Sequence, residues 1–179
     1  MKLLRTIRLD ASDTFVFDRA AEPGEWAVPG GFVYFDVDPD TLAGQARAAF
    51  RAGFLGIESL GHATLAQVVE ASAADREAAV EILAQRLVEN FGAPDLGAAL
   101  PAAEEEIAFA ASLCDHAPGT LIALHRVIED GAVREMFRSL KAREGAKPLR
   151  AFAFMEVEGE EASAQDNVDL VGLAEGRKP

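Results

Sequence analysis

The fold is decided by residues 121–137, which read Leu121-Ile-Ala-Leu-His-Arg-Val-Ile-Glu-Asp-Gly-Ala-Val-Arg-Glu-Met-Phe137. The pair Asp130-Gly131 stands between two β-rich runs, as in a two-residue hairpin. Antiparallel pairing across this turn brings compatible side chains together: Ile128 with Val133, Arg126 with Glu135, and Leu124 with Phe137. A helix is the alternative, because apolar residues at 121, 124, 128 and 132 also fit a helical stripe. We predict the hairpin.

Further strands are predicted from short β-branched, aromatic or alternating runs. They cover residues 3–9, 14–17, 26–28, 32–35, 54–59, 63–71 and 149–157. The turn Pro29-Gly30-Gly31 is expected to join two neighbouring antiparallel strands, and Gly61-His62 another pair. Together these runs indicate a largely antiparallel sheet.

Helices are predicted where apolar residues recur every three or four positions behind a capping residue. One follows Asp38-Pro39 and ends at Gly53, and a second covers 73–91 with Ser72 and Asp75 as a capping box. A third begins at Pro101 and ends at Ala117, with Glu104, Glu105 and Glu106 in its first turn. The sequence therefore predicts an α+β fold: a largely antiparallel sheet with two or three helices packed on one face.

The chain of 179 residues is expected to form a single domain over residues 1–157. Residues 158–179 are predicted to be an acidic, mobile tail, because residues 156–179 carry seven acidic and two basic side chains. Within that tail, the apolar stretch 168–173 is predicted to dock on the domain or on a partner.

Composition argues against several classes of partner. The formal charge of −13 disfavours nucleic acid and anionic membranes, which both attract clustered Lys and Arg. The single Cys114 cannot form an internal disulfide, and the first residues hold no unbroken apolar stretch, so we expect a cytoplasmic protein. No phosphate-cradling glycine motif occurs, and we predict no cofactor.

Some sequence patterns resemble metal-binding or catalytic motifs, but they lack the required residues at the required positions. Asp36, Asp38 and Asp40 begin like a calcium loop, but Thr41 and Arg47 replace the required Gly and Glu. The stretch Gly56-Ile-Glu-Ser-Leu-Gly61 lacks the first glycine of a nucleophile elbow. The three histidines, at 62, 116 and 125, show no paired metal-ligand spacing, so no metal site is predicted.

Aromatic residues at 15, 17, 26, 32, 34 and 35 crowd near the N-terminus. Core packing is the simplest explanation, and the alternative is an open groove or a dimer surface. If a ligand or partner binds there, the candidate residues are Trp26, Tyr34, Glu58 and His62. We predict no catalytic residue.

Three stretches carry a resemblance to a known family. They are Lys2-Leu-Leu-Arg-Thr-Ile-Arg-Leu-Asp10, Glu22-Pro-Gly-Glu-Trp-Ala-Val28 and Glu104-Glu-Glu-Ile-Ala-Phe-Ala-Ala-Ser-Leu-Cys-Asp115, with the turn Glu129-Asp130-Gly131 in addition. The chain resembles an uncharacterised proteobacterial family of unknown function over nearly its whole length. The resemblance implies a single bacterial domain and assigns no activity.

Three hypotheses follow for function. We favour a non-catalytic accessory or protein-interaction domain, which forms a homodimer or binds another protein. The second is a small-molecule binding domain with a pocket between sheet and helices, near Trp26 and Tyr34. The third is an enzyme whose site gathers separated histidines and carboxylates.

Overall fold

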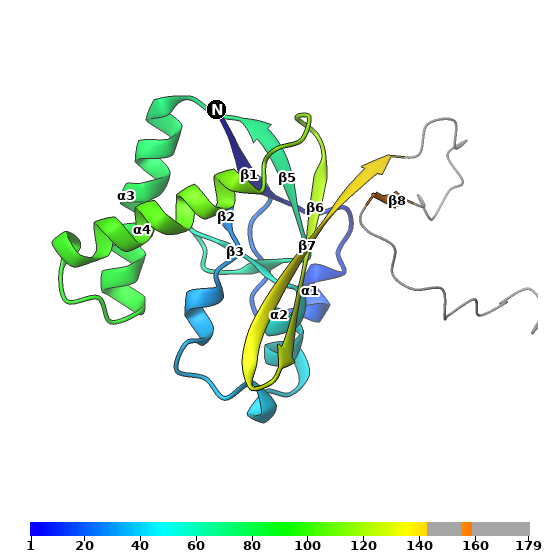
Figure 1. Ribbon diagram of the computed structural model, residues 1–179, viewed down its shortest axis with the longest axis horizontal. Coiled ribbons are helices and arrows are strands. Elements are labelled where there is room, and N and C mark those ends of the chain that lie inside the picture. The colour runs from blue at the N-terminus through cyan, green and yellow to red at the C-terminus, as the bar shows by residue number, and fades with distance from the viewer. Residues whose placement is uncertain (143–154, 159–179) are drawn as a thin grey trace, which may run out of the picture.

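The computed structural model describes residues 1–142 and 155–158. In this part of the chain eight strands form one sheet with the order β4-β3-β2-β1-β5-β6-β7-β8, and every neighbouring pair is antiparallel (Figure 1). The strands are β1 Lys2–Ile7, β2 Trp26–Val28, β3 Phe54–Gly56, β4 His62–Ala63, β5 Leu65–Glu70, β6 Leu121–Glu129, β7 Ala132–Ala142 and β8 Met155–Glu158. The predicted antiparallel α+β architecture is confirmed.

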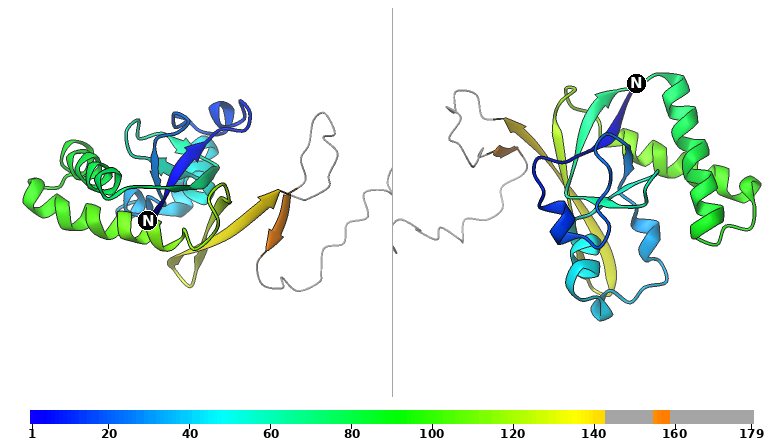
Figure 2. Two further views of the ribbon diagram at one scale, coloured as in Figure 1. Left: turned by 90° about the horizontal axis from the view of Figure 1, so that it is seen from above. Right: turned by 180° about the vertical axis from the view of Figure 1, so that it is seen from behind.

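Six helical segments accompany the sheet in the described residues. They are α1 Asp13–Val16, η1 Gly31–Tyr34, η2 Pro39–Thr41, α2 Gly44–Ala52, α3 Ala73–Asn90 and α4 Leu96–Ser112, where η marks a 3-10 helix. Helices α3 and α4 pack against each other beside the sheet, and α4 also contacts β1 and β2 (Figures 1 and 2). None of the helices in this part of the chain combines the length and apolar character that a membrane span requires.

The sheet curls so that its two ends approach each other. The Phe54 ring on β3 lies 6.5 Å from the Phe137 ring on β7, although four strands separate them in the sheet order. The buried apolar side chains of the sheet and of α3 and α4 form one core cluster. Curling therefore gives the sheet a concave inner face.

The β6–β7 hairpin forms in the predicted register. Arg126 pairs with Glu135, and the turn residues Asp130 and Gly131 have φ angles of 53° and 78°. Two consecutive positive φ angles define a type I′ turn, whose twist matches that of the flanking strands. The predicted capping box of α3 is also confirmed, because the Ser72 side chain accepts from the Asp75 N–H and the Asp75 carboxylate accepts from the Ser72 N–H.

Two predicted strands are wrong. Residues 14–16 belong to α1 and Phe17 caps its end, while residues 32–34 belong to η1 and Phe35 caps its end. Gly30 takes a left-handed φ of 72° and turns the chain out of the sheet, so Pro29-Gly30-Gly31 leads into η1 and joins no strand pair. The neighbours of β2 are β1 and β3. Among the aromatic side chains that suggested strands, Phe32 packs edge-on against Phe91 at 5.2 Å and Tyr34 packs edge-on against Phe50 at 5.1 Å.

Several predicted boundaries also shift. Asp38 caps the short η2, and α2 begins only at Gly44. Helix α4 begins at Leu96 because Asp95 caps it, with Oδ1 accepting from the Ala98 N–H at 2.9 Å, and it ends at Ser112. Pro101 therefore lies inside the helix, and Glu104, Glu105 and Glu106 lie beyond its first turn. Of the predicted strand 149–157, β8 covers 155–157, and the rest lies outside the described residues, as does the predicted tail beyond Glu158.

Candidate functional site

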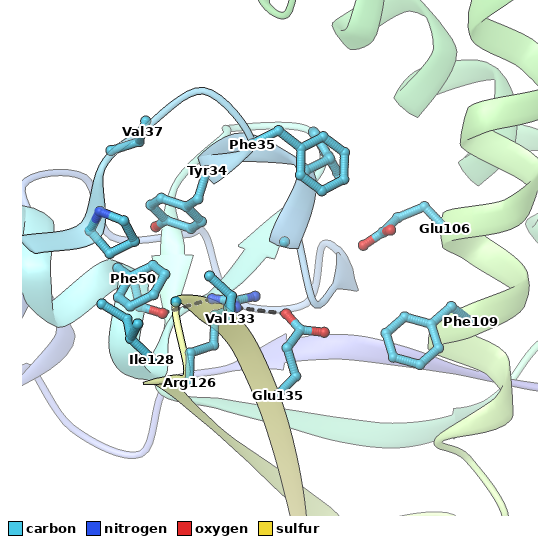
Figure 3. Close-up of a pocket in the computed structure, with 14 residues that line it drawn as sticks. Tyr34, Phe35, Val37, Phe50, Glu106, Phe109, Arg126, Ile128, Val133 and Glu135 are labelled. Carbon is cyan, nitrogen blue, oxygen red and sulfur yellow. Dashed lines mark hydrogen bonds and ion pairs between the residues drawn. The ribbon is translucent and has the colours of Figure 1, made fainter.

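A pocket of about 540 Å³ opens between η1, α2, α4 and the tip of the β6–β7 hairpin (Figure 3). Most of its wall is apolar: Phe32, Tyr34, Phe35, Val37, Pro39, Phe50, Phe109, Ile128 and Val133. Three charged side chains complete it: Glu106, Arg126 and Glu135. The pocket joins segments that lie far apart in the sequence.

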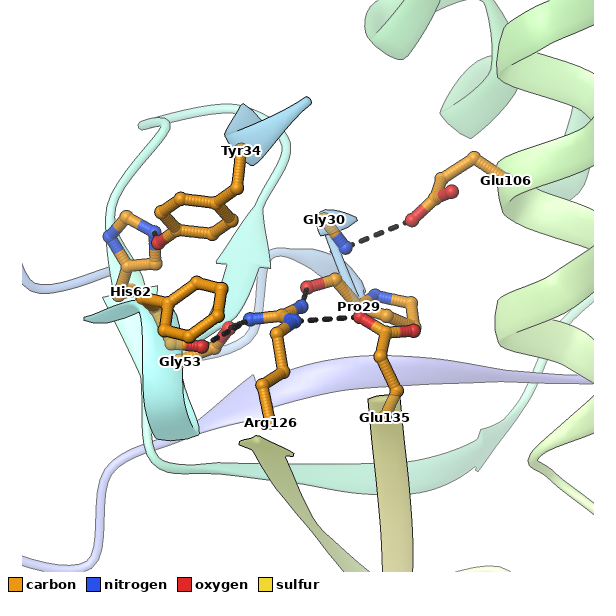
Figure 4. A network of polar contacts seen from close by, with 9 residues as sticks. Pro29, Gly30, Tyr34, Gly53, His62, Glu106, Arg126 and Glu135 are labelled. Atoms are coloured by element: carbon orange, nitrogen blue, oxygen red, sulfur yellow. Dashed lines mark hydrogen bonds and ion pairs between the residues drawn. The ribbon is translucent and has the colours of Figure 1, made fainter. Parts of the chain in front are cut away.

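Arg126 projects from β6 and is only 1% exposed. Its Nε donates to Oε1 of Glu135 at 2.6 Å, and its Nη1 donates to the carbonyls of Phe50 at 2.9 Å and Gly53 at 3.3 Å (Figure 4). Its Nη2 donates to the carbonyl of Pro29. Phe50 and Gly53 stand at the C-terminus of α2, where unpaired carbonyls attract a cation. Arg126 thus ties β6 to β7, to α2 and to the end of β2.

Two carboxylates stand on the same pocket. Oε1 of Glu106, on α4, accepts from the Gly30 N–H at 2.9 Å, while Glu135 on β7 holds Arg126. Burial raises the pKa of Glu106 and the Glu135 carboxylate adds to the rise, while the Gly30 hydrogen bond and the charge of Arg126 oppose it. With both carboxylates ionised, the three charged groups sum to −1.

Tyr34 and His62 form a second contact at the pocket wall. The Tyr34 hydroxyl lies 3.4 Å from Nε2 of His62, and its ring meets the Phe50 ring edge-on at 5.1 Å. Burial lowers the pKa of His62 to about 4, and the positive charge of Arg126 adds to this effect. His62 is therefore neutral near pH 7, and its ring packs against Phe17.

The four residues named from the sequence do not meet in one place. Tyr34 lines the pocket and His62 touches Tyr34. Trp26 is buried elsewhere, with the Arg5 guanidinium 3.7 Å from the centroid of its ring. Glu58 is exposed, and its hydrogen bonds are made by its backbone: its carbonyl accepts from Arg86, and its N–H donates to the Glu25 carboxylate.

Sequence reasoning missed Glu106 and Phe109 as site residues, and it paired Arg126 with Glu135 without assigning them to a site. A signal for Arg126 existed in the strand itself. It shares the two-residue phase of Ile122 and Leu124, so a correctly paired strand turns it inward. An Arg in the inward phase of a strand is a mark of a buried polar site, because such a charge needs compensating partners.

The stretch 56–61 that resembled a nucleophile elbow is a turn held by buried Glu25. The Glu25 carboxylate accepts from the N–H groups of Glu58 at 2.9 Å and Ser59 at 2.8 Å, and from the Ser59 hydroxyl. A Cβ on Gly56 would lie 2.4 Å from the Glu25 carboxyl carbon, so any side chain there would displace the buried Glu25 carboxylate. The Ser59 hydroxyl is committed to this structural network.

Other residues that the sequence suggested for chemistry are also buried or take part in structural contacts. Asp38 accepts from the Asp40 N–H at 3.0 Å, and the carbonyl of His116 accepts from Lys2. Cys114 is buried, and burial raises the pKa of its thiol to about 11. Within residues 1–142 and 155–158, no three His, Cys, Asp or Glu side chains gather in a way that could hold a metal ion.

Fold and site together define a single class of protein: an α+β domain with a curled antiparallel sheet and an open, aromatic, acidic pocket. Over residues 1–158 the chain matches a family of unknown function, DUF6505, and it belongs to that family. No curated protein and no solved structure matches it.

Proposed function

We propose that this domain is a non-catalytic binding module whose pocket takes an organic cation with an apolar body. The observation that carries the proposal is the pair of carboxylates, Glu106 and Glu135, on one aromatic pocket. A carboxylate pair lined by aromatic rings suits an ammonium, amidinium or guanidinium group.

Arg126 does not cancel this preference. A guanidinium has five N–H groups, and four of those of Arg126 already have protein acceptors. An anionic ligand would therefore meet one nearly saturated cation and two carboxylates. The formal charge of −13 on the whole chain favours a cationic ligand further.

The aromatic wall supplies the apolar part of the site. Phe35 is 83% exposed and Phe109 is 39% exposed, so both rings are open to a ligand. A cation over an aromatic face gains roughly 0.5–2 kcal/mol, depending on its desolvation. The pocket volume of about 540 Å³ lies in the usual range for ligand sites, roughly 300–1,000 Å³.

The surroundings of His62 support a binding role for the pocket more than an acid–base role. His62 contacts Tyr34 and Phe17, and its low pKa leaves the imidazole uncharged and a weak base near pH 7. A general base works best with a pKa near the operating pH. Glu106 and Glu135 remain as charged groups that can hold a cation.

We also propose a bacterial, cytoplasmic setting. Thirteen Arg stand against four Lys, which is typical of GC-rich bacterial coding sequences, and the single cysteine cannot form an internal disulfide.

Benzamidine and its neutral isostere benzamide test the proposal by isothermal titration calorimetry. We expect benzamidine to bind at least about tenfold more tightly, because a hydrogen bond to a charged group contributes roughly 1.5–3 kcal/mol. Glu106→Gln should remove most of that difference, whereas Glu105→Gln, an exposed neighbour on α4, should not. Equal binding of the two compounds would contradict the proposal.

The pH dependence provides a second readout. Benzamidine favours the ionised carboxylate, so its affinity should rise as pH increases from the ordinary Glu value of 4.5 through the raised pKa of Glu106. Above that pKa the affinity should level off. In Glu106→Gln this rise should shrink, and an unchanged profile would show that Glu106 does not hold the cation.

A further inference from the structure

Among the residues that the structure describes, part of one edge of strand β7 beside the pocket has no pairing strand. In a two-residue hairpin the residues flanking the turn, Glu129 and Ala132, form a hydrogen-bonded pair, and the pattern then alternates. Val133, Glu135 and Phe137 therefore direct their backbone N–H and C=O groups away from β6. Strand β8 pairs with β7 only from Ser139 onward. In the part of the chain that the structure describes, nothing pairs with these three residues along that edge.

We propose that a partner protein adds an extended basic segment to this edge and places an Arg or Lys side chain opposite Glu135. The inference rests on the proposed cation pocket and names the source of the cation. Unpaired strand edges are established docking sites for extended peptides, where backbone hydrogen bonds give affinity and alternate side chains give specificity.

The edge and the pocket share residues. Val133 and Glu135 line the pocket, and Phe137 meets Phe109 edge-on at 5.7 Å. A residue directly opposite Glu135 has its Cβ about 4.5–5.5 Å from the Glu135 Cβ, on the same face of the sheet. A long cationic side chain at that position points toward the pocket. It can reach Glu135, and it extends toward the side of the pocket on which Glu106 lies (Figure 3).

The side chains on the opposite face of β7 indicate which residue types the partner strand carries on its other face. Arg134 and Arg138 are both exposed there, on either side of Met136. Acidic residues opposite the two arginines would complement them. The fitting strand therefore alternates: one basic residue between apolar ones on the pocket face, and acidic residues on the other.

A second copy of this chain fits the edge poorly. Antiparallel two-fold pairing centred on Glu135 sets that carboxylate opposite its own copy. Centring on Arg134 does the same for a guanidinium, and centring on Met136 sets Arg134 opposite Arg138 of the second copy. Like charges directly opposite each other destabilise a strand pair. In these three registers the homodimer that the sequence allowed is therefore disfavoured, and a different protein is the better occupant of the edge around Glu135.

The probe is the peptide acetyl-Ser-Glu-Val-Thr-Arg-Glu-Val-Thr-amide, whose Arg falls opposite Glu135 when antiparallel. In a ¹⁵N-labelled full chain, we expect it to shift the amide signals of Val133, Glu135 and Phe137. Replacing its Arg by citrulline, a neutral isostere, should weaken binding about tenfold or more. Val133→Pro removes one outward N–H and should abolish binding, while Val133→Thr keeps the N–H and should bind.

The outcomes separate the two proposals. If benzamidine binds and the peptide does not, strand addition is overturned and the cation pocket stands. If neither binds, the pocket proposal fails as well. Equal affinity for the citrulline peptide would overturn the placement of the cation opposite Glu135. Slow hydrogen exchange at Val133, Glu135 and Phe137 in the free full chain would show that the edge is already occupied, and would also overturn the inference.

Discussion

Replacing Arg126 with Met isolates the contribution of one buried guanidinium. Met keeps the length of the aliphatic stem and removes the charge. The change leaves the Glu135 carboxylate and the carbonyls of Pro29, Phe50 and Gly53 without their donor. These acceptors come from three separate segments, so the loss reaches well beyond the hairpin.

The expected loss is large. Removing one partner of a buried ion pair costs about 3–5 kcal/mol, because the remaining charge stays desolvated and unpaired. At about 2–4 °C per kcal/mol for a domain of this size, the melting temperature should fall by roughly 6–20 °C. The same hairpin offers a matched control in the ion pair of Arg134 with Glu129, whose side chains are 64% and 54% exposed. Arg134→Met should cost less than about 1 kcal/mol.

Thermal unfolding followed by circular dichroism, with urea denaturation at 25 °C, measures both variants. Equal losses for Arg126→Met and Arg134→Met would refute the reasoning that burial decides the energy. The double variant Arg126→Met with Glu135→Leu gives a second check. It should recover part of the loss, because it no longer buries an unpaired carboxylate.

Two further predictions concern the core. Gly56→Ala should lower the free energy of unfolding by about 1–3 kcal/mol, and with it the urea midpoint, because the new Cβ would force the Glu25 carboxylate out of the turn it holds; an unchanged midpoint would contradict this. Cys114 should not react with a chromogenic disulfide reagent at pH 8 until guanidinium unfolds the chain, because the thiol is buried and its pKa is about 11. Rapid labelling of the native protein would show that this part of the core opens.

Sequence reasoning was accurate where the signal is local. Asp130-Gly131 alone specifies a two-residue turn, and the turn fixes the register of every pair behind it. Ser72 and Asp75 likewise specify the start of α3 through contacts only three residues apart. In both cases the interacting groups are close in sequence, so no tertiary context is needed.

Sequence reasoning failed where contacts between residues distant in the sequence determine the local structure. Aromatic runs at 14–17 and 32–35 suit strands by propensity, but no neighbouring strand is available to either of them. The start of α4 was placed at Pro101 because proline favours the first turn of a helix. Asp95 supplies a cap one turn and a half earlier, and the helix accommodates Pro101 inside.

The candidate site was only partly predictable for the same reason. Tyr34 was named from the sequence as a candidate and lines the pocket, whereas Trp26 and Glu58 lie away from it. Glu106 was predicted only as an acidic residue in the first turn of a helix, because its approach to the hairpin depends on the curl of the whole sheet. Pairing of Arg126 with Glu135 was predicted, but their burial follows from α2 and Pro29, which meet them only in the folded chain.

The charged groups of the pocket have two different roles. The buried cation Arg126 holds the surrounding segments together, whereas the carboxylates of Glu106 and Glu135 determine which ligand charge the pocket accepts. Four of the five N–H groups of Arg126 have protein acceptors, so Arg126 holds the end of β2, α2 and β7 in place before a ligand arrives. A site that is already formed loses little conformational freedom on binding.

If the two carboxylates select the ligand, Arg126→Met should still bind benzamidine when it is assayed well below its lowered melting temperature. Its affinity should equal or exceed that of the native protein, because the charge at the pocket changes from −1 to −2. Loss of binding by a folded Arg126→Met variant would mean instead that the geometry of the pocket, and not its charge, selects the ligand.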